Sequence, residues 1–184
     1  MPSEHPTNPL DDRRKAQEEE YFRKQNQEAA EKLKARLGLE SSGIDDKELV
    51  AKLAEAGFDS DSSRALYMVP LVEVAWADGK MQGEERTQIL SFARERGIDS
   101  TSKAYGLVEK WLNCQPSDNQ YELAKSLIGP IVAHSKSNHP EAKEWVLKAS
   151  QKVAEATGGL FGFGFKMVSK DEAEVIDRLS KKLK

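Results

Sequence analysis

The amino-acid sequence predicts an all-α protein, and two observations lead to that prediction. Along the 184 residues, no stretch shows the strict alternation of apolar and polar side chains that is typical of a half-buried strand. Segments with an apolar stripe at helical spacing instead follow one another, and glycine, proline and helix-capping residues separate them. We therefore expect a bundle of at least six helices, preceded by an extended N-terminal helical arm.

The N-terminal part predicts an arm with little to bury. Residues 1–10 are polar and contain prolines, so we expect a disordered tail. Residues 11–37 contain no glycine or proline and are rich in Ala, Glu, Lys, Arg and Gln, which lose least on entering a helix. The segment lacks the continuous apolar stripe, about 100° wide, of a core helix. Residues 38–44, rich in serine and glycine, are expected to form a linker.

Residues 45–184 carry the pattern of a helical bundle. The expected helices cover about 46–56, 62–77, 83–96, 101–113, 117–134, 140–156 and 169–183. The segment 62–77 is the most hydrophobic, with apolar side chains nearly all round, and therefore belongs in the middle of the bundle. Pro70 should kink this helix or mark the end of its first turn.

The composition excludes several classes of protein. A net charge of −3 without clustered Lys and Arg gives no basis for nucleic-acid binding. No apolar run approaches the ~20 residues of a membrane span, and no secretory or organellar leader is recognisable, so we expect a cytoplasmic protein. Cys114 is the only cysteine, which excludes a disulfide framework. No nucleophile–base pair or full metal shell is present, and we expect a protein without catalytic activity.

The sharpest local motif is the run DGKMQGEE at residues 78–85. It matches the second half of a calcium-binding EF-hand loop, in which Asp78 and Glu85 would supply oxygens to the cation. The first half of the loop is absent, because Val74 and Trp76 stand where acidic ligands belong. The alternative interpretation is a corner between two helices, whose acids complement the dipole of the second helix.

An acidic side chain also lies inside the apolar segment. Burying an unpaired carboxylate costs several kcal/mol, so Glu73 must face solvent, an arginine such as Arg86, or a cation. The candidate cation site therefore consists of Glu73, Asp78, Glu84 and Glu85. A divalent cation would fit these carboxylates, with calcium the best candidate.

The run GGLFGFGF at residues 158–165 does not match a phosphate-binding loop, since it lacks the Lys-Ser/Thr ending and a preceding strand. Its phenylalanines either pack on the bundle or contact a partner or a membrane surface.

The central segment resembles a known family. The run VPLVEVAWADGK at residues 69–80, with Glu-Glu-Arg at 84–86 and Ile-Leu at 89–90, resembles the TerB-like tellurite-resistance family. The resemblance extends over about residues 60–140. It implies an all-helical bundle, a link to stress response and to metal-sensing complexes at membranes, and metal-binding roles for Glu73, Asp78 and Glu85.

The arm carries a second resemblance. The run AQEEEYFRKQ at residues 16–25, followed by Glu28 and by Leu-Lys at 33–34, resembles the inhibitory helix of the mitochondrial ATP synthase inhibitor family. That helix wedges into a catalytic interface of the ATP synthase head. The resemblance implies a partner-binding set in this chain, namely Glu18, Glu19, Tyr21, Phe22, Arg23 and Gln25.

These observations together predict a non-catalytic, stress-linked binding or regulatory protein, cytoplasmic or peripheral to a membrane complex. The arm would bind a protein partner or a second copy of the chain, and the acidic loop would hold a cation. The alternative is an inhibitor of a rotary ATP synthase that acts through the arm, with the bundle as its anchor or sensor.

Overall fold

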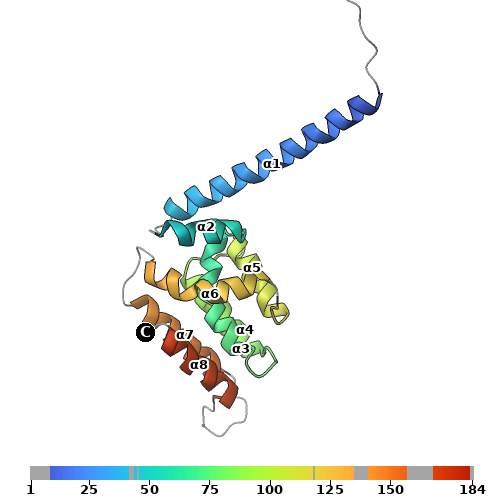
Figure 1. Cartoon of the computed structure of the whole chain (residues 1–184). Coiled ribbons are helices and arrows are strands. Elements are labelled where there is room, and N and C mark those ends of the chain that lie inside the picture. The colour runs from blue at the N-terminus through green and yellow to red at the C-terminus, as the bar shows by residue number, and fades with distance from the viewer. Residues whose placement is uncertain are drawn as a thin grey trace, which may run out of the picture.

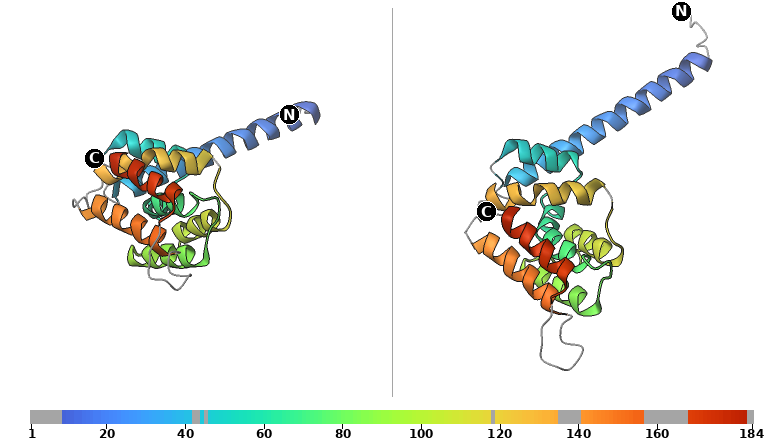
Figure 2. Two further views of the ribbon diagram at one scale, coloured as in Figure 1. Left: turned by 90° about the horizontal axis from the view of Figure 1, so that it is seen from below. Right: turned by 60° about the horizontal axis from the view of Figure 1, so that its bottom comes forward.

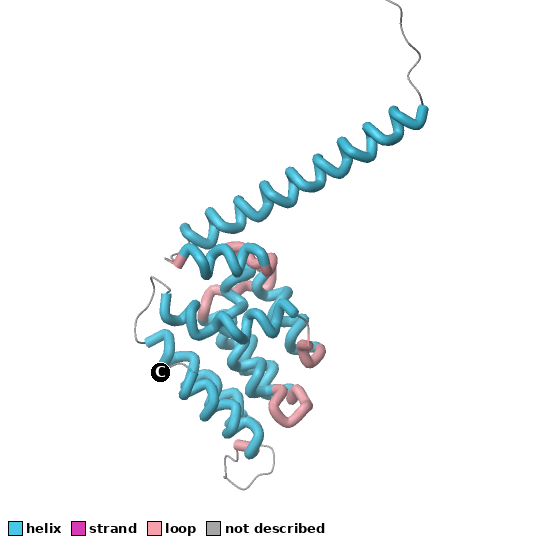
Figure 3. The backbone as a smooth tube through the Cα atoms, in the orientation of Figure 1, coloured by secondary structure: helices cyan, strands magenta, loops and turns pink. Residues whose placement is uncertain are grey.

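The computed structural model describes residues 9–41, 44, 46–117, 119–134, 141–156 and 168–182. These residues form eight α-helices and one 3-10 helix, η1, and contain no β-strand (Figures 1 and 3). The predicted all-α fold is therefore confirmed. Residues 1–8 of the expected tail and the run GGLFGFGF lie outside the described residues.

The first helix, α1 (Pro9–Ser41), projects from the remaining helices as a long arm (Figures 1 and 2). Its side chains from residue 13 to residue 34 are all exposed. The helix starts earlier than expected, so residues 9 and 10 belong to it and not to a tail. Proline suits this position, because the first helical residues have no intrahelical acceptor for their N–H groups.

The predicted linker over residues 38–44 is wrong at its start, because α1 continues to Ser41. Leu39 is fully buried and packs with Ala35 against α2 (Lys47–Glu55). Burying one leucine is worth about 1.5–3 kcal/mol, which exceeds the cost of about 1 kcal/mol for Gly38 inside a helix. A Cβ atom at Gly38 would lie 3.2 Å from the Oγ of Ser60, so glycine also permits this close approach.

The helix α2 starts with a side-chain cap, and the cap is Asp46. The Asp46 carboxylate accepts hydrogen bonds from the backbone N–H groups of Glu48 and Leu49, at 2.9 and 3.1 Å. Its apolar face is buried at Leu49 and Leu53. The cap matters for the arm, since α2 is the surface that receives the end of α1.

The predicted helix over residues 62–77 consists of two elements, η1 (Ser62–Met68) and α3 (Val69–Ala75). Pro70 lies in the first turn of α3, where its missing N–H costs no hydrogen bond, and the chain before it takes the tighter 3-10 form. Every residue of α3 is buried except Glu73, which is half-buried. The central position predicted for this segment is thus confirmed.

The remaining helices surround α3. They are α4 (Gly83–Glu95), α5 (Lys103–Asn113), α6 (Asn119–His134), α7 (Glu141–Ala156) and α8 (Lys170–Lys182). Helices α4, α6, α7 and α8 all contact α3, while α5 packs on η1 and α7 lies against both α4 and α8. Trp111 on α5 is the largest fully buried side chain, and its backbone carbonyl accepts a hydrogen bond of 2.9 Å from the indole N–H of Trp76.

Candidate functional site

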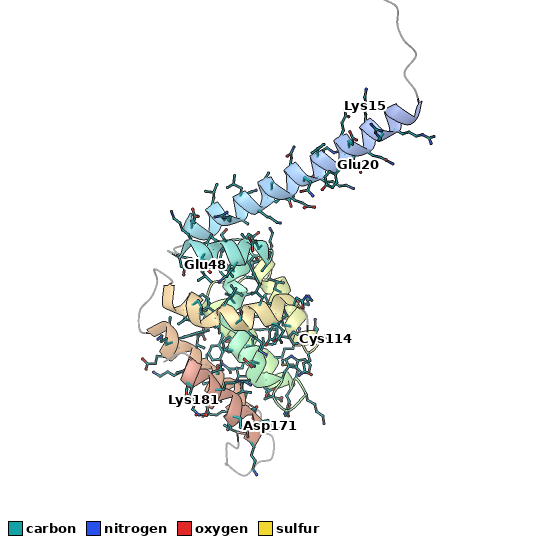
Figure 4. The ribbon with its side chains drawn as sticks, viewed as in Figure 1. Lys15, Glu20, Glu48, Cys114, Asp171 and Lys181 are labelled. Atoms are coloured by element: carbon teal, nitrogen blue, oxygen red, sulfur yellow. The ribbon has the colours of Figure 1, made fainter. Side chains whose placement is uncertain are left out.

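The projecting part of α1 exposes two aromatic side chains. Tyr21 is 61% exposed and Phe22 is 62% exposed, and their rings meet edge to face with centroids 5.9 Å apart. The helix around them is held by ion pairs between side chains one turn apart, such as Glu20 to Lys24 at 3.2 Å. Figure 4 places Lys15 and Glu20 on the part of α1 that stands clear of the bundle. Nothing in the described chain covers these rings.

The partner-binding set predicted from the sequence is accessible as a whole. All six side chains, those of Glu18, Glu19, Tyr21, Phe22, Arg23 and Gln25, are exposed on α1. They contact no other helix closely, since it is the end of α1 near Leu39 that packs on the bundle. Whether they bind a partner stays a prediction.

Two leucines extend the exposed apolar surface toward the bundle. Leu33 is 57% exposed and Leu37 is 58% exposed. Ala35, which lies between them in the chain, and Leu39, which follows them, instead pack on the bundle. The last turns of α1 therefore have one side against α2 and another side open to solvent. The composition of residues 11–37 predicts an arm with little to bury, but it does not predict this division.

In the central helix α3, Glu73 has basic partners. Its Oε1 lies 2.5 Å from Nη2 of Arg178 on α8 and 3.6 Å from Nζ of Lys125 on α6. Its side chain is 15% exposed, so the two cations compensate a largely buried carboxylate. Arg86, the partner suggested from the sequence, instead bonds to Glu109. An arginine does face Glu73, but it comes from the C-terminal helix.

The corner between α3 and α4 is organised by its own acids. Gly79 takes a φ of 82°, which favours glycine, and the Asp78 carboxylate accepts a hydrogen bond of 2.9 Å from the backbone N–H of Lys80. Glu84 is exposed in the first turn of α4, where its charge complements the helix dipole. Both features agree with the corner interpretation.

Glu85 is the unusual member of the acidic group, because it is 1% exposed. Its carboxyl accepts a hydrogen bond of 2.9 Å from the backbone N–H of Gln82, and the Gln82 side chain caps the start of α4 in return. The start of α8 repeats this arrangement: Glu172, 4% exposed, accepts a bond of 2.7 Å from the N–H of Ser169. The Ser169 hydroxyl accepts from the N–H of Glu172 at 3.2 Å.

The two buried carboxyl groups meet. Burial raises the pKa of Glu85 to about 8, the N–H of Gln82 opposes that rise, and a hydrogen bond with Glu172 and the nearby Asp78 charge add to it. A hydrogen bond between two carboxyl groups requires a proton on one of them, because a carboxylate only accepts. At neutral pH, Glu85 therefore carries a proton and joins the starts of α4 and α8.

The structure brings the four predicted cation ligands together only in part. Asp78 lies near enough to Glu85 to raise its pKa, whereas Glu73 is paired with Arg178 and Glu84 faces solvent. Within the described ranges, no group of three or more His, Cys, Asp or Glu side chains could hold a metal ion. Glu172 is the residue that the sequence analysis missed at this corner. Its place at the third position of a capping box was the available signal.

Comparison of the chain with protein families, with characterised proteins and with solved structures gives no match. In the part of the chain that the structure describes, no helix combines the length and hydrophobicity needed to cross a membrane. The fold and site define a class, a helical bundle that carries a projecting helix.

Proposed function

We propose that this protein is a non-catalytic binding and regulatory protein, in which the bundle holds α1 as a ligand for a partner protein. The observation that carries the proposal is the exposure of Tyr21 and Phe22, at 61% and 62%, on a helix that is anchored only at its other end. Large aromatic side chains dominate the energy of protein interfaces when a partner buries them.

The surroundings of the two rings indicate the chemistry of the partner. Glu18, Glu19 and Glu20 precede the rings, and Arg23 and Lys24 follow them. A complementary surface would offer an apolar pocket for the rings, bordered by basic groups on one side and acidic groups on the other. The charges would set the orientation of the helix, while the rings supply most of the affinity.

The finer functional assignments rest on the two resemblances. The first is a stress-linked, TerB-like regulatory protein, cytoplasmic or peripheral to a membrane complex. The second candidate is an inhibitor of a rotary ATP synthase. It is supported by the free projection of α1, which leaves the whole predicted set around Tyr21 and Phe22 accessible to an enzyme interface.

Site-specific photo-cross-linking tests the proposed function. A photoreactive phenylalanine at position 22 of the full-length protein should capture one protein of the host cell that is not a second copy of this chain, and the same group at position 48, on the exposed side of α2, should not. The purified partner should bind the full-length protein, and Phe22→Ala should weaken binding at least about 30-fold, or ~2 kcal/mol.

The identity of the captured protein separates the two candidates. Capture of a subunit of the ATP synthase head, with inhibition of ATP hydrolysis by the full-length protein and its loss in Phe22→Ala, would support the inhibitor. Another partner would support the regulatory protein. Equal binding of a purified partner to the wild type and to Phe22→Ala would contradict both.

A divalent cation at the acidic corner is a smaller, separate proposal, supported by the carboxyl pair of Glu85 and Glu172. Calcium could replace the proton between them, so binding should strengthen above about pH 8. At about 100 times the dissociation constant, calcium should raise the free energy of unfolding by ~2.7 kcal/mol, and Asp78→Ala with Glu85→Ala should abolish this rise. Identical unfolding in calcium and in EDTA would leave only the corner interpretation.

A further inference from the structure

One face of α1 carries a regular set of exposed side chains, which we call the α1 stripe. Its positions are spaced alternately four and three residues apart, as in the seam of a coiled coil. They are Lys15, Glu19, Phe22, Asn26, Ala29, Leu33, Arg36 and Glu40. All eight side chains are exposed.

The α1 stripe lies on the open side of the helix. At 100° per residue, its centre is rotated by roughly 130° from the direction of Ala35 and Leu39. Those two side chains pack on the bundle, whereas Leu33 is 57% exposed at nearly the same height along the helix. A second helix can therefore lie along the stripe without displacing α2.

The α1 stripe is complementary to itself when it is read backwards. Its four central positions hold the apolar side chains of Phe22, Ala29 and Leu33 together with Asn26, while each end carries one acidic and one basic side chain. Reversal of the order places every charge opposite a charge of the other sign. The four resulting pairs are Lys15 with Glu40, Glu19 with Arg36, Phe22 with Leu33, and Asn26 with Ala29.

We propose that two copies of this chain associate through an antiparallel pairing of their α1 stripes. A twofold axis between residues 27 and 28 makes each of the four pairs occur twice, as a closed twofold interface requires. The Phe22 ring of each copy then lies against Leu33 of the other copy. Opposite charges meet at both ends, and the two bundles stand at opposite ends of the paired helices.

The charge order favours a second copy in this orientation over other arrangements. A parallel pair would set Glu19 against Glu19 and Arg36 against Arg36, and such like-charge contacts cost free energy. Asn26 lies at the middle of the stripe, and a single polar residue in a seam typically specifies register at some cost in stability. An unrelated helix would have no reason to match this reversed order.

The inference goes beyond the proposed function and does not depend on it. Phe22 takes part in both, so pairing between copies and binding of a partner protein compete. Tyr21 points away from the centre of the stripe by about 110° and is outside the pairing. Self-association would hold the partner-binding surface in reserve until a partner displaces the second copy.

Charge reversal at one predicted pair tests the proposal. Sedimentation equilibrium of the full-length protein should show a monomer–dimer equilibrium. Glu19→Arg alone and Arg36→Glu alone should each raise the dissociation constant at least tenfold, since each puts two like charges together twice. Both changes in one chain should restore the wild-type constant. The matched control, Glu20→Arg, makes the same charge change on the other side of α1 and should leave the constant unchanged.

Spin labels test the orientation. In a Cys114→Ser background, a label at Gln17 should report a separation of more than about 30 Å between copies, because the two labelled positions lie 21 residues apart along the paired helices, at 1.5 Å each. Parallel helices would place the two labels at the same height, so this axial separation would vanish and only the shorter distance across the two helices would remain. A protein that stays monomeric at millimolar concentration, a dimer whose constant ignores Glu19→Arg, or a short label distance would each overturn the proposal.

Discussion

Raising the pH from about 5 to about 9 should lower the free energy of unfolding by about 3–5 kcal/mol, because the folded protein holds a proton on Glu85. The pKa of this carboxyl is raised from 4.5 to about 8 in the folded state. Below pH 4.5 both states hold the proton. Between the two values only the folded state holds it, so stability falls as the pH rises, by 1.36 kcal/mol per unit at most. Above about pH 8 the loss is complete.

Glu85→Gln should remove most of this dependence. The glutamine oxygen can accept from the Gln82 N–H, and its amide can donate to Glu172, so the variant imitates the protonated acid. It should be more stable than the wild type above about pH 8 by a similar few kcal/mol. Urea unfolding at a series of pH values measures both effects, with the exposed neighbour Glu84→Gln as the control.

Parallel pH curves for the wild type and Glu85→Gln would contradict this account of the buried pair. Glu172→Gln provides an independent check. It replaces the carboxyl that faces Glu85 by an amide that can donate to it, so the pKa of Glu85 should fall and the loss of stability should begin at lower pH. The same variant leaves the Ser169 cap in place, since the amide oxygen can still accept from its N–H.

Leu39→Ala should destabilise the protein by about 2–5 kcal/mol, although the serine and glycine content of residues 38–44 predicts a linker there. Its side chain is fully buried between α1 and α2, and alanine would leave a cavity there. Leu37→Ala is the matched control, two residues away on the same helix. Because Leu37 is 58% exposed, its replacement should change the free energy of unfolding by no more than about 0.5 kcal/mol.

Urea unfolding measures the two leucine variants, and amide hydrogen exchange locates the change. In Leu39→Ala, exchange should accelerate in α2 and in the last turns of α1 more than in α3. Equal effects of the two substitutions would mean that the end of α1 is not anchored by Leu39. The projecting part of α1 should exchange quickly in the dilute monomer of all three proteins.

The sequence by itself determined the helical class and most helix ends, because both depend on neighbours in the chain. Asp46 caps α2 and Ser169 caps α8, each through backbone N–H groups two or three residues away in the chain. The exposure of residues 13–34 also follows from composition, since a helix with few large apolar side chains has little to bury.

Only the tertiary structure decided which distant groups meet. The burial of Leu39 overrides the local linker pattern around Gly38, because its contacts with α2 come from packing and not from neighbouring residues. Arg178 reaches Glu73 across 105 positions, and the pairing of Glu85 with Glu172 joins the starts of α4 and α8. Such contacts have no periodicity in the chain. They exist because helices pack around α3 in one arrangement, and a buried charge must find its partner within that arrangement.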